Sequence, residues 1–236
     1  MIKRNYNLID RDDDFVCDFH IHSHYSYDSI LPIKKIIKVS IRKNLDCIAI
    51  TDHNSVKGAI EAKKIADTKI MIVTGSEIRT EYGDIIGLFL NETISTKILL
   101  EVIDEIKSQG GLIVAPHRYK SQIKNHLNYA DIVEVANARI SENLNNKAYD
   151  YSVQHSLPGI GSSDAHMGYE IGKIRTIYSQ PVHDEEDLRK EMLRNNCEIQ
   201  GICSPRWVHY ISASIGAYKT GTMRNLFQST LKKKFH

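Results

Sequence analysis

The stretch DFHIHSHYSYD, residues 18–28, closes a short apolar run and carries an Asp, three His and a second Asp. Alternate side chains of a strand point to the same face, so His20 and His22 can both offer an imidazole nitrogen to one ion. His24 continues the alternation beyond the expected strand end, where we expect it to be solvated or to face a substrate. This density of metal-capable side chains predicts a metal site.

Similar apolar, β-branched runs recur along the chain, and most are followed by a polar turn and a segment with helical spacing. The runs are DFVCDFHI, LDCIAIT, KIMIVTGSEI, DIIGLFL, GLIVAPH, DIVEVAN, LPGIGSS and KIRTIYS. Apolar residues at helical spacing predict helices over 33–41 and 98–106, and Tyr82-Gly83-Asp84 predicts the tight turn of a hairpin. This rhythm of strands and helices is typical of an α/β barrel.

Length and composition favour one globular unit of 236 residues with 42% hydrophobic and 25% charged residues. The formal net charge of +2 argues against binding to bulk nucleic acid or an anionic membrane, and leaves a local basic site open. The charged N-terminus does not resemble a signal peptide, and no apolar run approaches the roughly 18 residues that cross a bilayer. With four cysteines and no CxxC pair, we expect a reduced cytoplasmic protein without membrane contact.

Metal-capable side chains stand at the carboxyl ends of the apolar runs. They are Asp18, His20, His22, Asp52, His53, Glu77, His117, Glu134, Asn137, Asp164 and His166. The carboxyl ends of barrel strands meet on one face, so residues far apart in sequence converge there. A mixture of imidazoles and carboxylates suits Zn, Mn or Fe better than Mg or Ca. Any one of these motifs alone could be a turn or a helix cap, but five histidines in such positions are hard to explain as independent caps.

With these residues in view, the sequence resembles the PHP (polymerase and histidinol phosphatase) family of metal-dependent phosphoesterases. The resemblance rests on DFHIHSHYSYDS, ITDHNSVKGA, GSEI, APH, VEVANAR and GSSDAH, in the family's order over about residues 16–170. It implies a distorted (β/α)7-type barrel, related to the TIM barrel, with the metal site at the C-terminal ends of the strands. It also implies two or three divalent metal ions as cofactors.

Carried over residue by residue, the resemblance implies a ligand set. The metal ligands would be His20, His22, Asp28, His53, Glu77, His117, Glu134, Asp164 and His166. Glu77 would bridge two ions, and Glu134 stands where some relatives place a His. The residues expected to act directly in catalysis are His20, His22, Glu77, Asp164 and His166. Asp18 and Asp52 are expected to orient the neighbouring imidazoles from behind, with direct metal binding as the alternative for Asp52.

The implied activity is hydrolysis of a phosphomonoester or short phosphodiester, such as a nucleotide or small phosphorylated metabolite, through a metal-activated water. Arg79, Arg118 and Arg139 each follow a motif, and guanidinium groups there would suit bidentate phosphate binding. Short nucleic acid is a further candidate partner. The alternatives are an amidohydrolase-like metal hydrolase and a catalytically idle PHP-like module that binds a nucleotide or a partner.

The C-terminal segment forms a separate expectation. We expect a phosphoesterase domain over 1–203, followed by a helical extension with a basic tail over 204–236 that packs on the barrel. The residues that recur at helical spacing in this extension are Trp207, Tyr210, Ile211, Ile215 and Tyr218. An oligomer contact and a substrate lid are the alternative roles.

Overall fold

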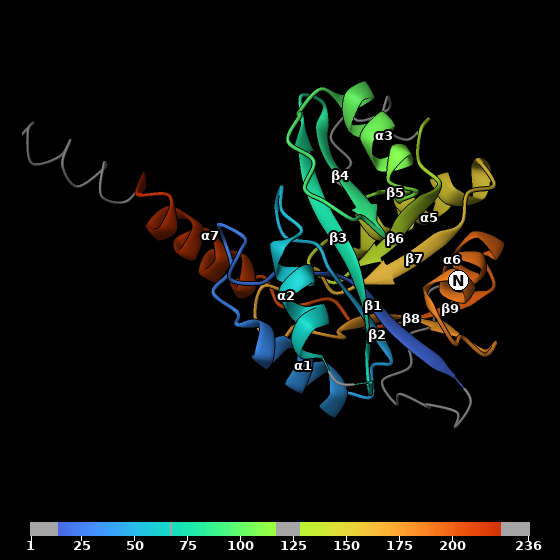
Figure 1. The fold of residues 1–236 in the computed structure, drawn as a ribbon, viewed down its shortest axis with the longest axis horizontal. Coiled ribbons are helices and arrows are strands. Elements are labelled where there is room, and N and C mark those ends of the chain that lie inside the picture. Colours follow the sequence, from blue (N-terminus) through green and yellow to red (C-terminus); the bar gives the residue numbers. More distant parts are fainter. Residues whose placement is uncertain (1–13, 67, 117–127, 223–236) are drawn as a thin grey trace, which may run out of the picture.

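The structure is a computed structural model that describes residues 14–66, 68–116 and 128–222 (Figure 1). The predictions for His117, Arg118 and the basic tail after residue 222 lie outside the described residues. No helix in the described ranges combines the length and apolar character that crossing a membrane requires.

The strands of the described chain form one sheet in the order β7-β6-β5-β4-β3-β2-β1-β8-β9. They are β1 (Phe15–Ile21), β2 (Cys47–Ile50), β3 (Met71–Thr80), β4 (Gly83–Leu88), β5 (Leu112–Ala115), β6 (Ile132–Asn137), β7 (Gly159–Ser162), β8 (Ile174–Tyr178) and β9 (Cys197–Gly201). The sheet curls back on itself, because Thr176 Oγ1 in β8 donates to Gly161 O and accepts from Gly161 N in β7, both at 2.8 Å. The result is a nearly closed α/β barrel, as the sequence predicts.

Pairing directions explain why the barrel is distorted. The pairs β1–β2, β2–β3, β5–β6 and β6–β7 are parallel, whereas β3–β4, β4–β5, β1–β8 and β8–β9 are antiparallel. The predicted hairpin is present, with Thr80 paired to Gly83. Each of the eight apolar runs overlaps a strand, but the sequence does not predict β9, CEIQG, in which two of the five residues are polar.

Helices pack on the outside of the barrel. They are α1 (Ile33–Arg42), α2 (Lys57–Ile65), α3 (Leu99–Ser108), α5 (Glu142–Gln154), α6 (Glu185–Arg194) and α7 (Trp207–Lys219). The predicted helices correspond to α1 and α3, whose apolar stripes are buried. In Figure 1, α1 and α2 lie beside β1 and β2, and α3 lies over β4 and β5.

A register shift in β1 directs the predicted ligands into the barrel. Cys17 and Phe19 pack in the cluster that the strands share, whereas Val16 and Ile21 pack under the helices. Strict alternation would place Ile21 with Cys17, so the irregularity between Asp18 and Ile21 reverses the faces. The two free cysteines of β1 and β2, Cys17 and Cys47, are buried.

Helix α7 shows a different buried face from the one that the sequence spacing indicates. Its buried residues are Val208, Ser212 and Gly216, while Tyr210 and Tyr218 are 75% and 78% exposed. Small residues occupy this buried face because α7 lies against the β1–α1 loop. A Cβ on Gly216 would lie 3.5 Å from Asp28 Cβ. An aromatic side chain would not fit in that space.

Candidate metal centre

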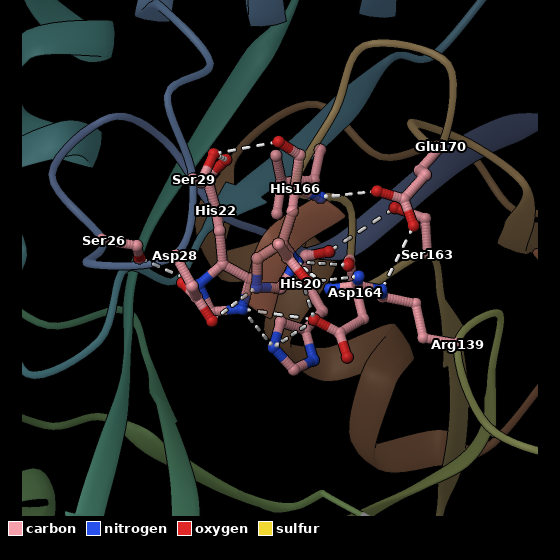
Figure 2. A network of polar contacts seen from close by, with 12 residues as sticks. His20, His22, Ser26, Asp28, Ser29, Arg139, Ser163, Asp164, His166 and Glu170 are labelled. Atoms are coloured by element: carbon pink, nitrogen blue, oxygen red, sulfur yellow. Dashed lines mark hydrogen bonds and ion pairs between the residues drawn. The ribbon is translucent and has the colours of Figure 1, made fainter. Parts of the chain in front are cut away.

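Four side chains from three parts of the chain converge at the carboxyl end of β1, and Figure 2 shows His20, His22 and Asp164 among them. His20 Nε2 and His22 Nε2 lie 3.0 Å apart. Asp164 Oδ1 is 3.6 Å and 3.3 Å from these two nitrogens. Glu77 Oε2 is 3.5 Å and 3.3 Å from them. Ligand atoms at metal bonds of about 2.0–2.1 Å in a tetrahedral shell lie about 3.3 Å from each other, so this spacing fits one ion.

A second group of ligand atoms adjoins the first. Asp28 Oδ2 lies 3.3 Å from His53 Nε2 and 3.0 Å from His166 Nε2. His53 Nδ1 lies 3.2 Å from Glu77 Oε2. His22, Asp28, His53 and His166 together offer ligand atoms within 4.8 Å of one another. Glu77 Oε2 therefore contacts histidines of both groups, His20 and His22 in the first and His53 in the second.

Hydrogen bonds behind His20 and His22 determine which ring nitrogen faces the cluster. His20 Nδ1 donates to Glu134 Oε1 at 2.9 Å. His22 Nδ1 donates to Ser26 Oγ at 3.0 Å, because the hydroxyl hydrogen of Ser26 is given to Asp52 Oδ1 at 2.9 Å. With the proton on Nδ1, the lone pair of Nε2 in each ring is available to a metal.

Asp52 anchors the β1–α1 loop. Its carboxylate accepts from Ser23 N and Ser23 Oγ, both at 2.6 Å, and from Ser26 Oγ. Gly58 leaves room for it: a Cβ at Gly58 would lie 2.0 Å from Asp52 Oδ2. Asp52 therefore acts on His22 through a serine hydroxyl and not by direct contact.

Asp18 anchors a different loop. It accepts from Ser163 N at 2.9 Å, Ser163 Oγ at 2.5 Å and Gly172 N at 2.8 Å. These bonds hold the segment between β7 and β8, which carries Asp164 and His166. Burial raises the pKa of Asp18 above its ordinary value although these donors oppose the shift.

Glu134 lies behind His20. Besides His20 Nδ1, its Oε1 accepts from Ser162 Oγ, and its Oε2 accepts from Asn137 Nδ2 at 3.1 Å. Asn137 Nδ2 also reaches Asp164 Oδ2 at 3.3 Å. Both oxygens of Glu134 thus have donors, which suits a residue that orients His20 better than one that binds metal.

Arg139 joins the metal face to α7. Its Nη1 lies 2.6 Å from His166 Nδ1, and its Nη2 donates to Val208 O at 2.9 Å and to Ser212 Oγ at 2.7 Å. Its Nε lies 3.2 Å from Glu170 Oε1. His166 Nδ1 is also 2.9 Å from Asp164 O. In the tautomer that donates from Nδ1 to Asp164 O, the lone pair of Nε2 is available to a metal. In the tautomer whose Nδ1 accepts from Arg139, Nε2 carries the proton and does not bind a metal.

A cavity of about 320 Å³ opens beside this cluster, between the β1–α1 loop and α7. Asp28, Arg139 and His166 line it, together with Ser212 and Gly216 of α7. The other predicted phosphate-binding residue of the described chain is Arg79, which forms an ion pair with Asp84 at 3.0 Å. His24 is exposed on the β1–α1 loop.

Burial and the short distances between the side chains shift the pKa values of the groups in this cluster. Burial alone would lower the pKa of His22, but Asp164 and Glu77 raise it to about 9. Burial also opposes ionisation of Glu77, yet His53 and His20 hold its pKa well below the ordinary value. Burial and the neighbouring His22 lower the pKa of His166 to about 4. The cluster is therefore a set of ionised carboxylates that attract positive charge.

Several functional contacts escape sequence reasoning. Ser26 and Ser163 connect the buried aspartates to the ligands, and Glu170 accepts from His166 N at 3.1 Å. Tyr27 stacks on His53 with ring centroids 4.6 Å apart. The signal for Ser26 was present in HSHYSYDS, where serine recurs at every third position, but serine is too common at turns for this pattern to be read alone.

Comparisons with known proteins concern the family and the fold of the chain. The family model described as PHP domain matches residues 18–198. The uncharacterised protein MJ0417 of Methanocaldococcus jannaschii is 33% identical over 201 residues, which cover 78% of this chain and 79% of that protein.

Two solved structures share the fold. A two-domain protein of Bacteroides vulgatus that contains a predicted PHP-like metal-dependent phosphoesterase matches with a TM-score of 0.71 and 20% identity, over 86% of this chain and 70% of that one. A lesion-specific endonuclease of Pyrococcus furiosus matches with a TM-score of 0.60 and 17% identity, over 79% of this chain and 57% of that one. At these identities the likeness concerns the fold.

Proposed function

Because the chain belongs to the PHP domain family, we propose that it is a metal-dependent phosphoesterase that hydrolyses a phosphomonoester or a short phosphodiester. The observation that carries the proposal is the spacing of 3.0–3.6 Å between the His20, His22 and Asp164 ligand atoms. The donor set of imidazoles and carboxylates suits Zn, Mn or Fe. The predicted ligand His117 belongs to the proposal on the resemblance alone.

Each part of the site has a role in this proposal. Divalent ions, when bound, supply Lewis-acid activation of a water molecule and neutralise charge on phosphate oxygens. Glu134 and Ser26 hold the tautomers of His20 and His22 that expose Nε2. Arg139 lines the cavity beside His166, and with its other donors held by protein partners, one hydrogen of its Nη1 is left for a phosphate oxygen.

Helix α7 forms one wall of that cavity, where it would shield a bound substrate. Lys219 Nζ donates to the carbonyls of His24 at 2.8 Å, Ser26 at 2.5 Å and Ser29 at 3.0 Å. These bonds fix the end of α7 to the loop that carries Asp28. A wall at this position would exclude bulk water from a bound ester.

The test combines metal content with turnover. Protein as purified is assayed for bound metal, and then for hydrolysis of a chromogenic phosphomonoester and a chromogenic phosphodiester with added Mn or Zn. We expect at least two ions per chain and turnover that a chelator abolishes. His20→Ala should remove the activity, while the control His183→Ala, which changes an exposed histidine, should not.

Two results would contradict the proposal. Wild-type turnover in His20→Ala would show that the ligand assignment is wrong. Bound metal without turnover of either ester would favour an amide-cleaving hydrolase or an idle binding module instead.

A further inference from the structure

A second concave surface lies on the far side of the loop that carries Asp164 and His166. It is a cavity of about 830 Å³ between α1, the β7–β8 loop, the start of β8 and the end of β9. Its basic lining residues are Lys35, Arg42, Lys43, Lys173 and Arg175. Among the described residues that line it, none is Asp or Glu. In a chain whose net charge is only +2, this is a strong local concentration of positive charge.

These cations are close enough to act on one another. Burial, together with Arg175, Lys173 and Arg42, lowers the pKa of Lys43, and only the buried carboxyl of Asp18 behind the wall opposes the shift. Cations in the last turn of α1 are favoured by the helix dipole, which explains Arg42 and Lys43. It does not explain Lys173 and Arg175, which come from the opposite wall, so the cluster is suited to an anion placed between the walls.

The walls are held in place by their own hydrogen bonds. Lys43 Nζ donates to Tyr169 O at 3.2 Å and to Ile171 O, which ties the end of α1 to the β7–β8 loop. An ammonium has three donors, so Lys43 can still donate to a ligand. Arg175 Nε donates to Gly172 O at 3.0 Å, which fixes the guanidinium at the cavity wall.

Two aromatic rings stand at the edge of this cavity. Tyr169 lines it, and its ring stacks with that of Trp207 at a centroid distance of 6.0 Å and an interplanar angle of 28°. The two residues are 53% and 48% exposed. Lys173 Nζ lies 4.3 Å from the centroid of the Tyr169 ring. Half-exposed rings next to clustered cations are the combination that binds a base together with its phosphate.

We propose that this cavity is a nucleotide-binding site separate from the metal centre. The five basic residues bind the phosphate, and the Tyr169–Trp207 pair stacks with the base. The nucleotide is either free or one unit of a single strand, since both present the same chemistry. This inference does not depend on the proposed phosphoesterase activity, because none of the basic residues belongs to the metal cluster.

The chain supplies its own reporter for the test, since Trp207 is its single tryptophan. The full chain, kept in a chelator, is titrated with adenosine monophosphate, with a short oligothymidylate strand and with inorganic phosphate while tryptophan fluorescence is recorded. We expect quenching by the mononucleotide or by the strand, and competition by phosphate without quenching. Saturation by the mononucleotide assigns a free nucleotide, and quenching by the strand alone assigns a nucleic-acid strand.

Matched charge reversals on α1 distinguish binding at this cavity from a general electrostatic attraction between the chain and the anionic ligand. Lys35→Glu with Arg42→Glu should weaken binding about tenfold or more. The control, Lys34→Glu with Lys38→Glu, makes the same change of charge at exposed residues of the same helix outside the cavity lining. No quenching by either ligand, or equal weakening in both double variants, would overturn the proposal.

The phosphoesterase proposal is tested independently in the same variants. Hydrolysis of a chromogenic phosphomonoester with added metal should be unchanged in Lys35→Glu with Arg42→Glu. Absence of hydrolysis in the unmodified chain, with nucleotide binding intact, would count against the phosphoesterase alone.

Discussion

Removing the hydroxyl of Ser26 disturbs the candidate metal centre without changing a predicted ligand. Ser26→Ala removes the acceptor of His22 Nδ1 and of His53 N, each at 3.0 Å, and the donor to Asp52 at 2.9 Å. Each buried donor left without a partner costs about 1–3 kcal/mol, so the free energy of unfolding should fall by about 2–6 kcal/mol.

The same change should weaken metal binding. Loss of the group that fixes the tautomer of a ligating histidine typically reduces metal affinity about 10–100-fold. This corresponds to about 1.4–2.8 kcal/mol of binding free energy. Affinity is measured by competition with a chromogenic chelator, and stability by denaturant unfolding of the metal-free protein. Ser40→Ala is the matched control, because Ser40 is a buried serine of α1 whose hydroxyl has no hydrogen-bond partner among the described residues.

The reasoning would be refuted by a folded Ser26→Ala protein whose metal affinity stays within about twofold of the wild type, since the orienting contact is expected to be worth at least tenfold. A loss of stability in Ser40→Ala equal to that in Ser26→Ala would also refute it. In that case the cost would come from the lost volume of a buried hydroxyl and not from its hydrogen bonds.

Further predictions concern packing, protons and α7. Gly58→Ala places a Cβ 2.0 Å from Asp52 Oδ2, so unfolding by denaturant should show a loss of about 1–3 kcal/mol, and unchanged stability would contradict the close contact. The pKa of His22 is raised to about 9, so this imidazole carries a proton at neutral pH that metal must displace. Apparent metal affinity should therefore fall as pH drops below about 9, by about tenfold per pH unit for each displaced proton, and calorimetry in buffers of different ionisation enthalpy should detect proton release. Lys219→Met removes three bonds to the β1–α1 loop and should speed amide hydrogen exchange in α7, whereas equal exchange would show that these three bonds do not hold the helix in place.

The strands and the cluster of ligands were predictable because both follow from local patterns. Each of β1 to β8 overlaps one of the quoted apolar runs, which are seven to ten residues long, and a polar residue after such a run marks the face where strands end. The irregular register of β1 was not predictable in this way. Alternation alone puts His20 on the same face as Val16, and only the shift before Ile21 turns it into the barrel.

The buried face of α7 was not predictable from the sequence for a related reason. The helical spacing of Trp207, Tyr210 and Tyr218 indicates one face, but the distance of α7 from the neighbouring loop decides that the face with Ser212 and Gly216 packs. Arg139 Nη2 donates to Ser212 Oγ, so the buried face of the helix is polar as well as small. Tertiary contact with a charged residue overrides an apolar stripe here, and no single segment of the sequence carries that information.

The two buried aspartates show most clearly what the sequence leaves open. An Asp beside a His at the end of a strand suggests direct contact with the imidazole, yet Asp18 holds Ser163 and Gly172, and Asp52 holds Ser23 and Ser26. Asp18, in β1, therefore fixes the β7–β8 loop, which carries Asp164 and His166. Asp52, directly after β2, fixes the β1–α1 loop, which carries Asp28. Loops tied in this way keep the ligand atoms in place before any ion arrives, which lowers the cost of ordering the site on binding. Because a serine hydroxyl lies between the carboxylate of Asp52 and the imidazole of His22, we predict that Glu77, Asp28 and Asp164 supply the carboxylate ligands and that Asp52 does not.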